Sequence, residues 1–118
     1  MNPPLEPTDS NQILRHVFMW SVKPEFDGGL VLAELSTLPA LVPGLLSWSI
    51  GEHAGDEVHS SGSRYDYAIV CDFAGKAELD VYQKHPEHLA VVDRVLSMYQ
   101  EWAVVDFWMP QSASNWTP

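Results

Sequence analysis

The segment Tyr82-Gln83-Lys84-His85-Pro86-Glu87-His88 places one phenol and two imidazoles close together. A neutral imidazole in an apolar pocket can remove a proton near neutral pH. A phenol hydroxyl can donate a hydrogen bond to a carbonyl oxygen and stabilise the enolate that forms when the neighbouring carbon loses its proton. His88 as base and Tyr82 as donor therefore predict proton abstraction next to a carbonyl without a cofactor.

Two residues distant in the sequence are expected to join this pair. His16 lies in an apolar segment near the start of the chain and Asp106 in another near its end, and both segments are typical of strands. A carboxylate such as Asp106 can fix the tautomer of His88 and stabilise its cation. The candidate catalytic residues are His88, Tyr82, Asp106 and His16.

Each of these residues also has a purely structural interpretation. A buried histidine is often a hydrogen-bonded core residue, and a tyrosine often packs with its hydroxyl toward water. Asp106 near a strand end can accept from the backbone, and His85 can cap the junction between two helices. The sequence leaves a catalytic site and a hydrogen-bonded core both open.

Metal and cofactor sites lack support in the sequence. His85-x-x-His88 offers two ligands separated by Pro86, whereas a first-row metal site needs at least a third. His53 and His59 lie among acidic residues of a polar stretch, which favours a solvated loop. No Gly-rich phosphate loop, dinucleotide fingerprint or hydrolase elbow occurs, and the lone Cys71 is expected to pack as a small hydrophobe. We predict no metal and no cofactor.

Hydrophobic periodicity gives the elements that must position these side chains. The expected strands are Ile13–Val22, Leu45–Ile50 closed by Gly51, Tyr65–Phe73 and Ala103–Trp108. The expected helices are one through Val31 to Leu38, a short one over 76–84 and a longer one from Pro86 to Trp102, with a polar loop over 52–64. The stripe of the longer helix is His88, Val92, Val95, Tyr99 and Trp102.

Aromatic residues are expected between the helices and the sheet. They are core residues first, and a flat hydrophobic or aromatic ligand is the alternative use of the space that they enclose. The predicted ligand pocket comprises Phe18, Trp20, Trp48, Tyr67, Ile69, His85, Tyr99 and Trp102.

The order βαββαβ predicts an α+β, ferredoxin-like domain with a four-stranded antiparallel sheet. Helices can cover one face of this sheet, which leaves a second apolar face comprising Ile13, Val17, Met19, Val70, Val105 and Phe107. Exposed apolar faces are usually covered by a partner, so we expect a homodimer packed sheet to sheet.

Composition narrows the partners and the compartment. The formal net charge of −10 disfavours nucleic acid and anionic membranes. No apolar run is long enough to span a bilayer, and a single cysteine needs no oxidising compartment, so a cytoplasmic location is expected. Residues 1–11 and 110–118 are expected to be disordered tails around a domain over 12–109.

Five segments in order resemble the stress-responsive dimeric α/β-barrel (Dabb) family: Leu14-Arg15-His16-Val17, Val42-Pro43-Gly44-Leu45, Tyr65-Asp66-Tyr67-Ala68, Tyr82-x-x-His85-Pro86-x-His88 and Val104-Val105-Asp106-Phe107. The resemblance implies a dimeric α+β barrel, and many family members have no defined activity. Similarity to olivetolic acid cyclase-like relatives implies that Tyr82 and His88 run a cofactor-free aldol cyclisation.

The chain departs from the cyclase pattern through bulky side chains at Phe18, Trp20, Trp48 and Trp102, which leave less space for a long polyketide. Two functional hypotheses follow. One is a cofactor-independent enzyme, polyketide cyclase-like or isomerase-like. The other is a non-catalytic stress-responsive or ligand-binding dimer. A cofactor-free monooxygenase is a third alternative, which the wider dimeric α+β barrel superfamily implies.

Overall fold

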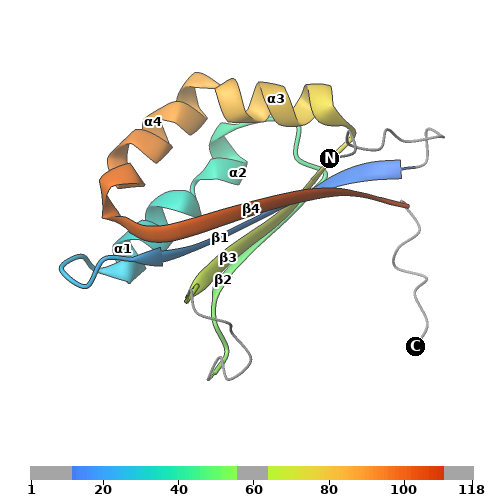
Figure 1. Ribbon diagram of the computed structural model, residues 1–118. Coiled ribbons are helices and arrows are strands. Elements are labelled where there is room, and N and C mark those ends of the chain that lie inside the picture. The colour runs from blue at the N-terminus through green and yellow to red at the C-terminus, as the bar shows by residue number, and fades with distance from the viewer. Residues whose placement is uncertain (1–11, 56–63, 111–118) are drawn as a thin grey trace, which may run out of the picture.

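The computed structural model describes residues 12–55 and 64–110. Its elements are β1 (Gln12–Val22), α1 (Gly28–Leu35), α2 (Leu38–Leu41), β2 (Ser47–Glu52), β3 (Tyr67–Phe73), α3 (Lys76–Lys84), α4 (Pro86–Val95), the 3₁₀ turn η1 (Leu96–Met98) and β4 (Tyr99–Pro110). The strands form one antiparallel sheet in the order β2-β3-β1-β4 (Figure 1). The predicted α+β, ferredoxin-like arrangement is confirmed.

Strand β1 lies in the middle of the sheet and sets the register of the site. His16 pairs with Cys71 on β3 and with Asp106 on β4. Since side chains alternate along a strand, His16 and its two partners project from the same face of the sheet. The register therefore joins residues that are far apart in the sequence.

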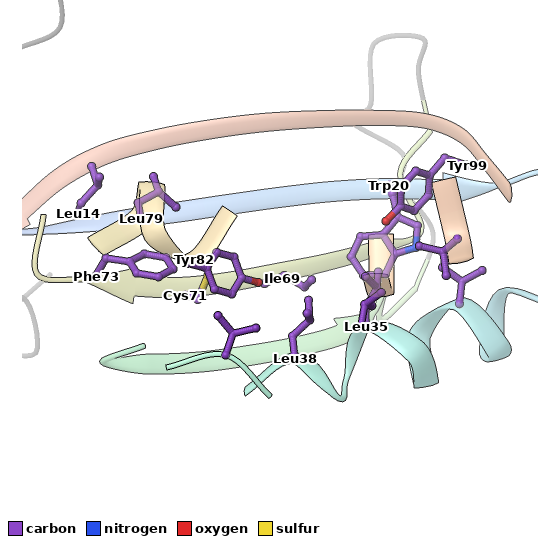
Figure 2. Packing of buried hydrophobic residues seen from close by; sticks show 14 residues of the cluster. Leu14, Trp20, Leu35, Leu38, Ile69, Cys71, Phe73, Leu79, Tyr82 and Tyr99 are labelled. Carbon is purple, nitrogen blue, oxygen red and sulfur yellow. The ribbon is translucent and has the colours of Figure 1, made fainter. Parts of the chain in front are cut away.

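Helices α1 to α4 cover that face, and the core lies between them and the sheet (Figure 1). The buried cluster includes Trp20, Phe73, Leu35 and Val91, each exposing 2% or less of its surface (Figure 2). Burial of side chains of this size provides the main favourable free energy of folding. The helices and the sheet thus form a two-layer domain.

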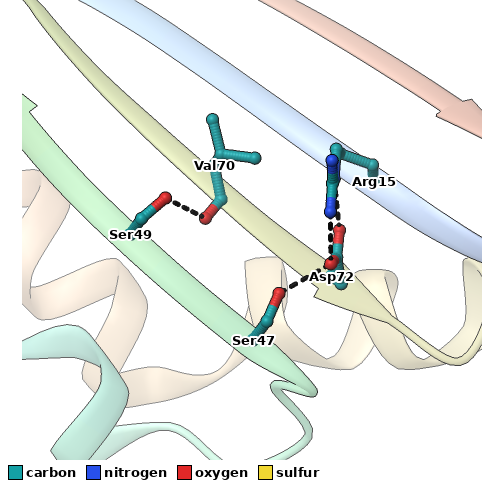
Figure 3. Close-up of polar contacts among 5 residues, drawn as sticks. All are labelled: Arg15, Ser47, Ser49, Val70 and Asp72. Carbon is teal, nitrogen blue, oxygen red and sulfur yellow. Dashed lines mark hydrogen bonds and ion pairs between the residues drawn. The ribbon is translucent and has the colours of Figure 1, made fainter. Parts of the chain in front are cut away.

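The opposite face of the sheet is left bare by the helices and is called the outer face below. Val105 and Phe107 on β4 expose 53% and 43% of their surface there. Arg15 and Asp72 form a two-pronged ion pair on this face, with Nε to Oδ1 at 2.8 Å and Nη2 to Oδ2 at 2.9 Å. The Ser47 hydroxyl donates to the same carboxylate at 2.6 Å (Figure 3).

The start of α1 depends on a close approach between Gly28 and β3. The Asp27 side chain caps the helix by accepting from the Gly29 amide. A Cβ atom at Gly28 would lie 2.0 Å from the Tyr67 hydroxyl oxygen, whereas one at Gly29 would meet only the Asp27 carboxylate, at 3.2 Å. The Tyr67 ring is held in place because it stacks on Trp20 with centroids 5.4 Å apart.

We expect Gly28→Ala to lower the free energy of unfolding by about 1 kcal/mol, because the methyl group displaces Tyr67 from its stack on Trp20. Gly29→Ala is the control in the same helical turn and should change stability by less than about half of that. Urea denaturation measures both, and equal effects of the two variants would contradict the proposed collision.

The junction between α3 and α4 holds the Tyr82 to His88 segment. His85 has extended backbone angles, and its Nδ1 accepts from the Glu87 amide at 3.1 Å. Pro86 occupies the first position of α4, where its missing N–H costs no helical hydrogen bond. The structural interpretation of His85 as a helix cap is confirmed.

The prediction that a helix continues to Trp102 is wrong. Helix α4 ends at Val95, and β4 begins at Tyr99 rather than Ala103. The pairing shifts at the end of β1, since Ser21 faces Glu101 and Val22 faces Tyr99, which leaves Gln100 as an extra residue. This bulge puts Tyr99 and Trp102 on the same face of a strand at a spacing of three, which resembles a helical repeat.

Other boundaries differ by smaller amounts. Strand β2 runs past Gly51 to Glu52, because Gly51 pairs with Ala68 like any strand residue, and β3 begins at Tyr67. Pro110 belongs to β4 rather than to a tail. The predicted tails over 1–11 and 111–118, and His59, lie outside the described residues.

Candidate active site

A cavity of about 230 Å³ lies between the helices and the sheet. The residues that line it come from helices α1 to α4, from η1 and from strands β1, β3 and β4. They are His16, Phe18, Leu35, Leu38, Ile69, Tyr82, Gln83, His88, Val92, Leu96, Tyr99, Trp102 and Val104. Leu96, Trp102 and Val104 expose between 50% and 55% of their surface, so the cavity opens to solvent beside β4.

Tyr82 and His88 lie against each other in this cavity. Their ring centroids are 4.6 Å apart at an interplanar angle of 57°. Tyr82 comes from the last turn of α3 and His88 from the first turn of α4, so the bend at His85 brings the two rings together. The Tyr82 hydroxyl points along the core toward Ile69 (Figure 2).

Burial keeps both groups neutral. It lowers the pKa of His88, with smaller contributions of the same sign from His16 and His85, while a hydrogen bond with the Gln83 backbone opposes part of the shift. Burial also raises the pKa of the Tyr82 hydroxyl. Nδ1 of His88 is buried without a hydrogen-bond partner among the described residues. A neutral imidazole and a protonated phenol are the forms required of a base and a donor.

His16 forms a second pair, with Asp106. Its Nδ1 lies 2.6 Å from Oδ1 of Asp106, and the His16 residue is only 7% exposed. Since an ionised carboxylate only accepts, Nδ1 donates this bond, and Nε2 is the acceptor when the ring is neutral. The expectation that Asp106 orients His88 is therefore replaced: the carboxylate orients His16.

The structure brings only some of the predicted pocket residues to the cavity. Phe18, Ile69, Tyr99 and Trp102 line it. Burial raises the pKa of the Tyr99 hydroxyl to about 12. The other predicted pocket residues lie elsewhere: Trp20 is fully buried in the core, Trp48 packs against the core from β2, Tyr67 stacks on Trp20, and His85 caps α4.

Part of the lining lies outside the predicted pocket residues, namely Leu35, Leu38, Gln83, Val92, Leu96 and Val104. Most are aliphatic, and an aliphatic residue beside a cavity has the same sequence pattern as one in a filled core. The available signals are the position of Val92 on the predicted sheet-facing stripe of the longer helix and the helical spacing of Leu35 and Leu38. Gln83 follows Tyr82 directly and gave none.

Among residues 12–55 and 64–110, no group of three or more His, Cys, Asp and Glu side chains is placed to hold a metal ion. None of the helices in these ranges is long and apolar enough to cross a membrane.

The fold and the cavity define a class: a ferredoxin-like α+β domain with two pairs of polar side chains, Tyr82 with His88 and His16 with Asp106, between its sheet and its helices. The family model described as the stress responsive A/B barrel domain (Dabb) matches residues 14–109. The chain belongs to this family, as the resemblance of its motifs implied.

Solved structures have the same fold. A dimeric ferredoxin-like protein of unknown function from Thermobifida fusca YX is 27% identical, with a TM-score of 0.68 over 84% of this chain and 92% of that one. A Dabb family protein from Mesorhizobium loti MAFF303099 is 18% identical, with a TM-score of 0.66 over 81% and 95%.

A hydroxynitrile lyase from Passiflora edulis has the same fold, with a TM-score of 0.74 over 92% of this chain and 99% of that one. At 16% identity the likeness shows the fold alone. No curated protein matches the chain.

Proposed function

We propose that this protein is a cofactor-free enzyme of small-molecule metabolism that removes a proton next to a carbonyl, as a cyclase or isomerase does. The observation that carries the proposal is the contact between a neutral imidazole, His88, and a protonated phenol, Tyr82, inside a cavity that reaches solvent. A hydrogen-bonded core would leave no such space beside them.

The reaction begins when His88 takes a proton from the carbon next to the carbonyl. The electron pair of the broken C–H bond moves into a C=C bond, and the carbonyl π electrons move to oxygen. Tyr82 donates a hydrogen bond to this enolate oxygen, on which negative charge develops in the transition state. Return of the proton to another carbon gives an isomer, and attack of the enolate on a second carbonyl closes a ring.

His16 and Asp106 provide a second acid–base group at the same cavity. With Nδ1 donating to Asp106, Nε2 of His16 can accept a proton, and the carboxylate then stabilises the resulting cation. Two separate bases on one cavity suit a reaction that moves a proton between two positions of one ligand.

The size of the cavity favours a small ligand. Pockets for drug-sized molecules have volumes of roughly 300–1,000 Å³, and a cavity of about 150 Å³ already accepts benzene. The cavity volume of about 230 Å³ suits a substituted benzene. Phe18, Tyr99 and Trp102 take up space that a long polyketide chain would need, so an isomerase or a small-ring cyclase is preferred.

The test is solvent exchange at the carbon between the ring and the carbonyl of 1-phenylpropan-2-one in D₂O, followed by proton NMR. We expect the protein to accelerate this exchange over buffer, and Tyr82→Phe to lower the accelerated rate by roughly 100-fold through loss of the carbonyl donor. Tyr65→Phe is the matched control, because Tyr65 lies outside this cavity, and it should retain the wild-type rate.

The rival function is a non-catalytic ligand-binding dimer, which is favoured by the packing of Trp20, Trp48 and Tyr67 into the core rather than around a ligand. Binding of the ketone without any acceleration of exchange by the wild-type protein would select this rival and end the enzyme proposal.

We further propose that the dimer forms through the outer face. Similar structures are described as dimeric, and the face carries exposed Val105 and Phe107. The charges of Arg15 and Asp72 on this face are paired with each other within the chain, so contact with a second copy would leave neither of these two groups unpaired. A cytoplasmic location stays a prediction.

A further inference from the structure

Among residues 12–55 and 64–110, no permanently charged side chain lines the cavity. The polar groups that these ranges contribute are the two imidazoles, two phenols, the Trp102 indole and the Gln83 amide, and none of their Lys, Arg, Asp or Glu side chains lines it. Carboxylates and phosphates are usually bound by arginine forks or by lysine. The lining offers neither.

All three arginines of the chain are paired with carboxylates away from the cavity. Arg15 is bound to Asp72 on the outer face, Arg94 binds Glu34 between α4 and α1, and Arg64 binds Asp66 beside β3. None of the three lines the cavity. An anion that entered would find no guanidinium there.

The imidazoles do not replace these cations. His88 is kept neutral by burial, and any positive charge on His16 is balanced by Asp106 at 2.6 Å. The formal net charge of −10 adds a repulsive field for anions. A buried ligand carboxylate would therefore lose its hydration without gaining a partner, which is costly.

We propose that the cavity selects neutral carbonyl compounds and rejects carboxylates and phosphate esters of the same size. The claim that the ligand is a carbonyl compound rests on the proposed function. The selection against anions rests on the residues that line the cavity and on the placement of the arginines. The excluded class includes keto acids and acyl groups carried on phosphorylated cofactors.

The test compares 1-phenylpropan-2-one with phenylpyruvate, which replaces the ketone's methyl group by a carboxylate. Dissociation constants come from NMR titrations of the histidine ring signals at neutral pH. We expect the neutral ketone to bind at least tenfold more tightly, a difference of about 1.4 kcal/mol. Equal or tighter binding of phenylpyruvate, or no binding of the ketone, would overturn the inference.

A charge variant makes the test specific to the cavity. Gln83 is exposed at its surface and lines the cavity, so Gln83→Lys places a cation at the ligand. We expect this variant to lower the ratio of the phenylpyruvate dissociation constant to the ketone dissociation constant by about tenfold. Gln100→Lys adds the same charge on β4 outside the lining and should leave the preference unchanged; a similar shift in both variants would assign selectivity to the overall charge and contradict the proposed role of the lining.

The binding comparison and the exchange assay can each give a negative result without the other. Selective binding of the ketone without exchange would end the enzyme proposal and leave the selection against anions in place. Exchange of the ketone together with equal binding of phenylpyruvate would keep the enzyme and remove the selectivity.

Discussion

Replacing His88 by alanine should slow the exchange of 1-phenylpropan-2-one by about 100-fold or more, because general base catalysis by a positioned side chain contributes roughly 10²–10⁴ in rate. The imidazole contacts Tyr82 and lines the cavity, so its loss removes the proton acceptor and leaves the carbonyl donor. His16 remains as a second base, which sets the residual rate.

The pH profile of the wild-type protein identifies the base. Because burial lowers the pKa of His88, the neutral, reactive form is populated below the ordinary histidine value of about 6.5. The exchange rate should rise with pH through this lowered pKa and reach its plateau before neutral pH. A rate that still rises above pH 7 would assign the proton abstraction to another group.

His53→Ala is the matched control for His88→Ala. Its Nδ1 contacts the Gly55 carbonyl oxygen and its ring lies outside the cavity, so the exchange rate should stay at the wild-type value. Circular dichroism and the unfolding transition show whether each variant is folded. A folded His88→Ala variant with wild-type exchange would remove His88 from the mechanism.

The fold could be predicted because the decisive signals are local. Alternation over Ile13–Val22 and Tyr67–Phe73 gives two strands, and Pro86 after a polar helix marks the start of the next one. The end of α4 could not be predicted in the same way. A bulge at Gln100 is set by pairing with β1, and without that pairing Tyr99 and Trp102 have a helical spacing.

The types of side chain at the candidate site could be predicted from the sequence, but the contacts between them could be predicted only in part. Tyr82 and His88 are close in the sequence, so their contact follows from the bend at His85. The partner of Asp106 depends instead on the register of β4 against β1, which places it opposite His16. Sequence periodicity assigns faces but not registers, and for that reason Asp106 was assigned to His88.

The second large effect is expected on the free energy of unfolding, from the ion pair between Arg15 and Asp72 on the outer face. Asp72 is 4% exposed and is held by Arg15 through two hydrogen bonds and by Ser47 through one (Figure 3). The hydrogen bond from Arg15 lowers the pKa of Asp72, with further lowering from Ser47 and from the charge of Arg15, against the opposing effect of burial. The carboxylate is therefore stable in its buried position only with its partners.

We expect Arg15→Leu to lower the free energy of unfolding by about 2 kcal/mol at pH 7, because a buried carboxylate loses its charged partner. This expected loss of unfolding free energy is smaller than the loss for a fully buried ion pair, since the Arg15 side chain is 33% exposed. Urea denaturation at one protein concentration measures it. Arg94→Leu is the control, because its pair with Glu34 is exposed on both sides, and it should cost less than about 1 kcal/mol.

The pH dependence separates the buried charge from lost packing. A carboxylate whose pKa is lowered in the folded state stabilises the fold above its unfolded pKa of about 4 and loses that contribution as the pH falls through the folded value. The cost of Arg15→Leu should therefore be largest at neutral pH and shrink toward pH 3. Adding Asp72→Asn to Arg15→Leu should recover part of the loss at pH 7, because no buried charge then remains. A cost that is the same at pH 7 and pH 3, with no recovery in the double variant, would show that Arg15 acts through packing and not through its charge.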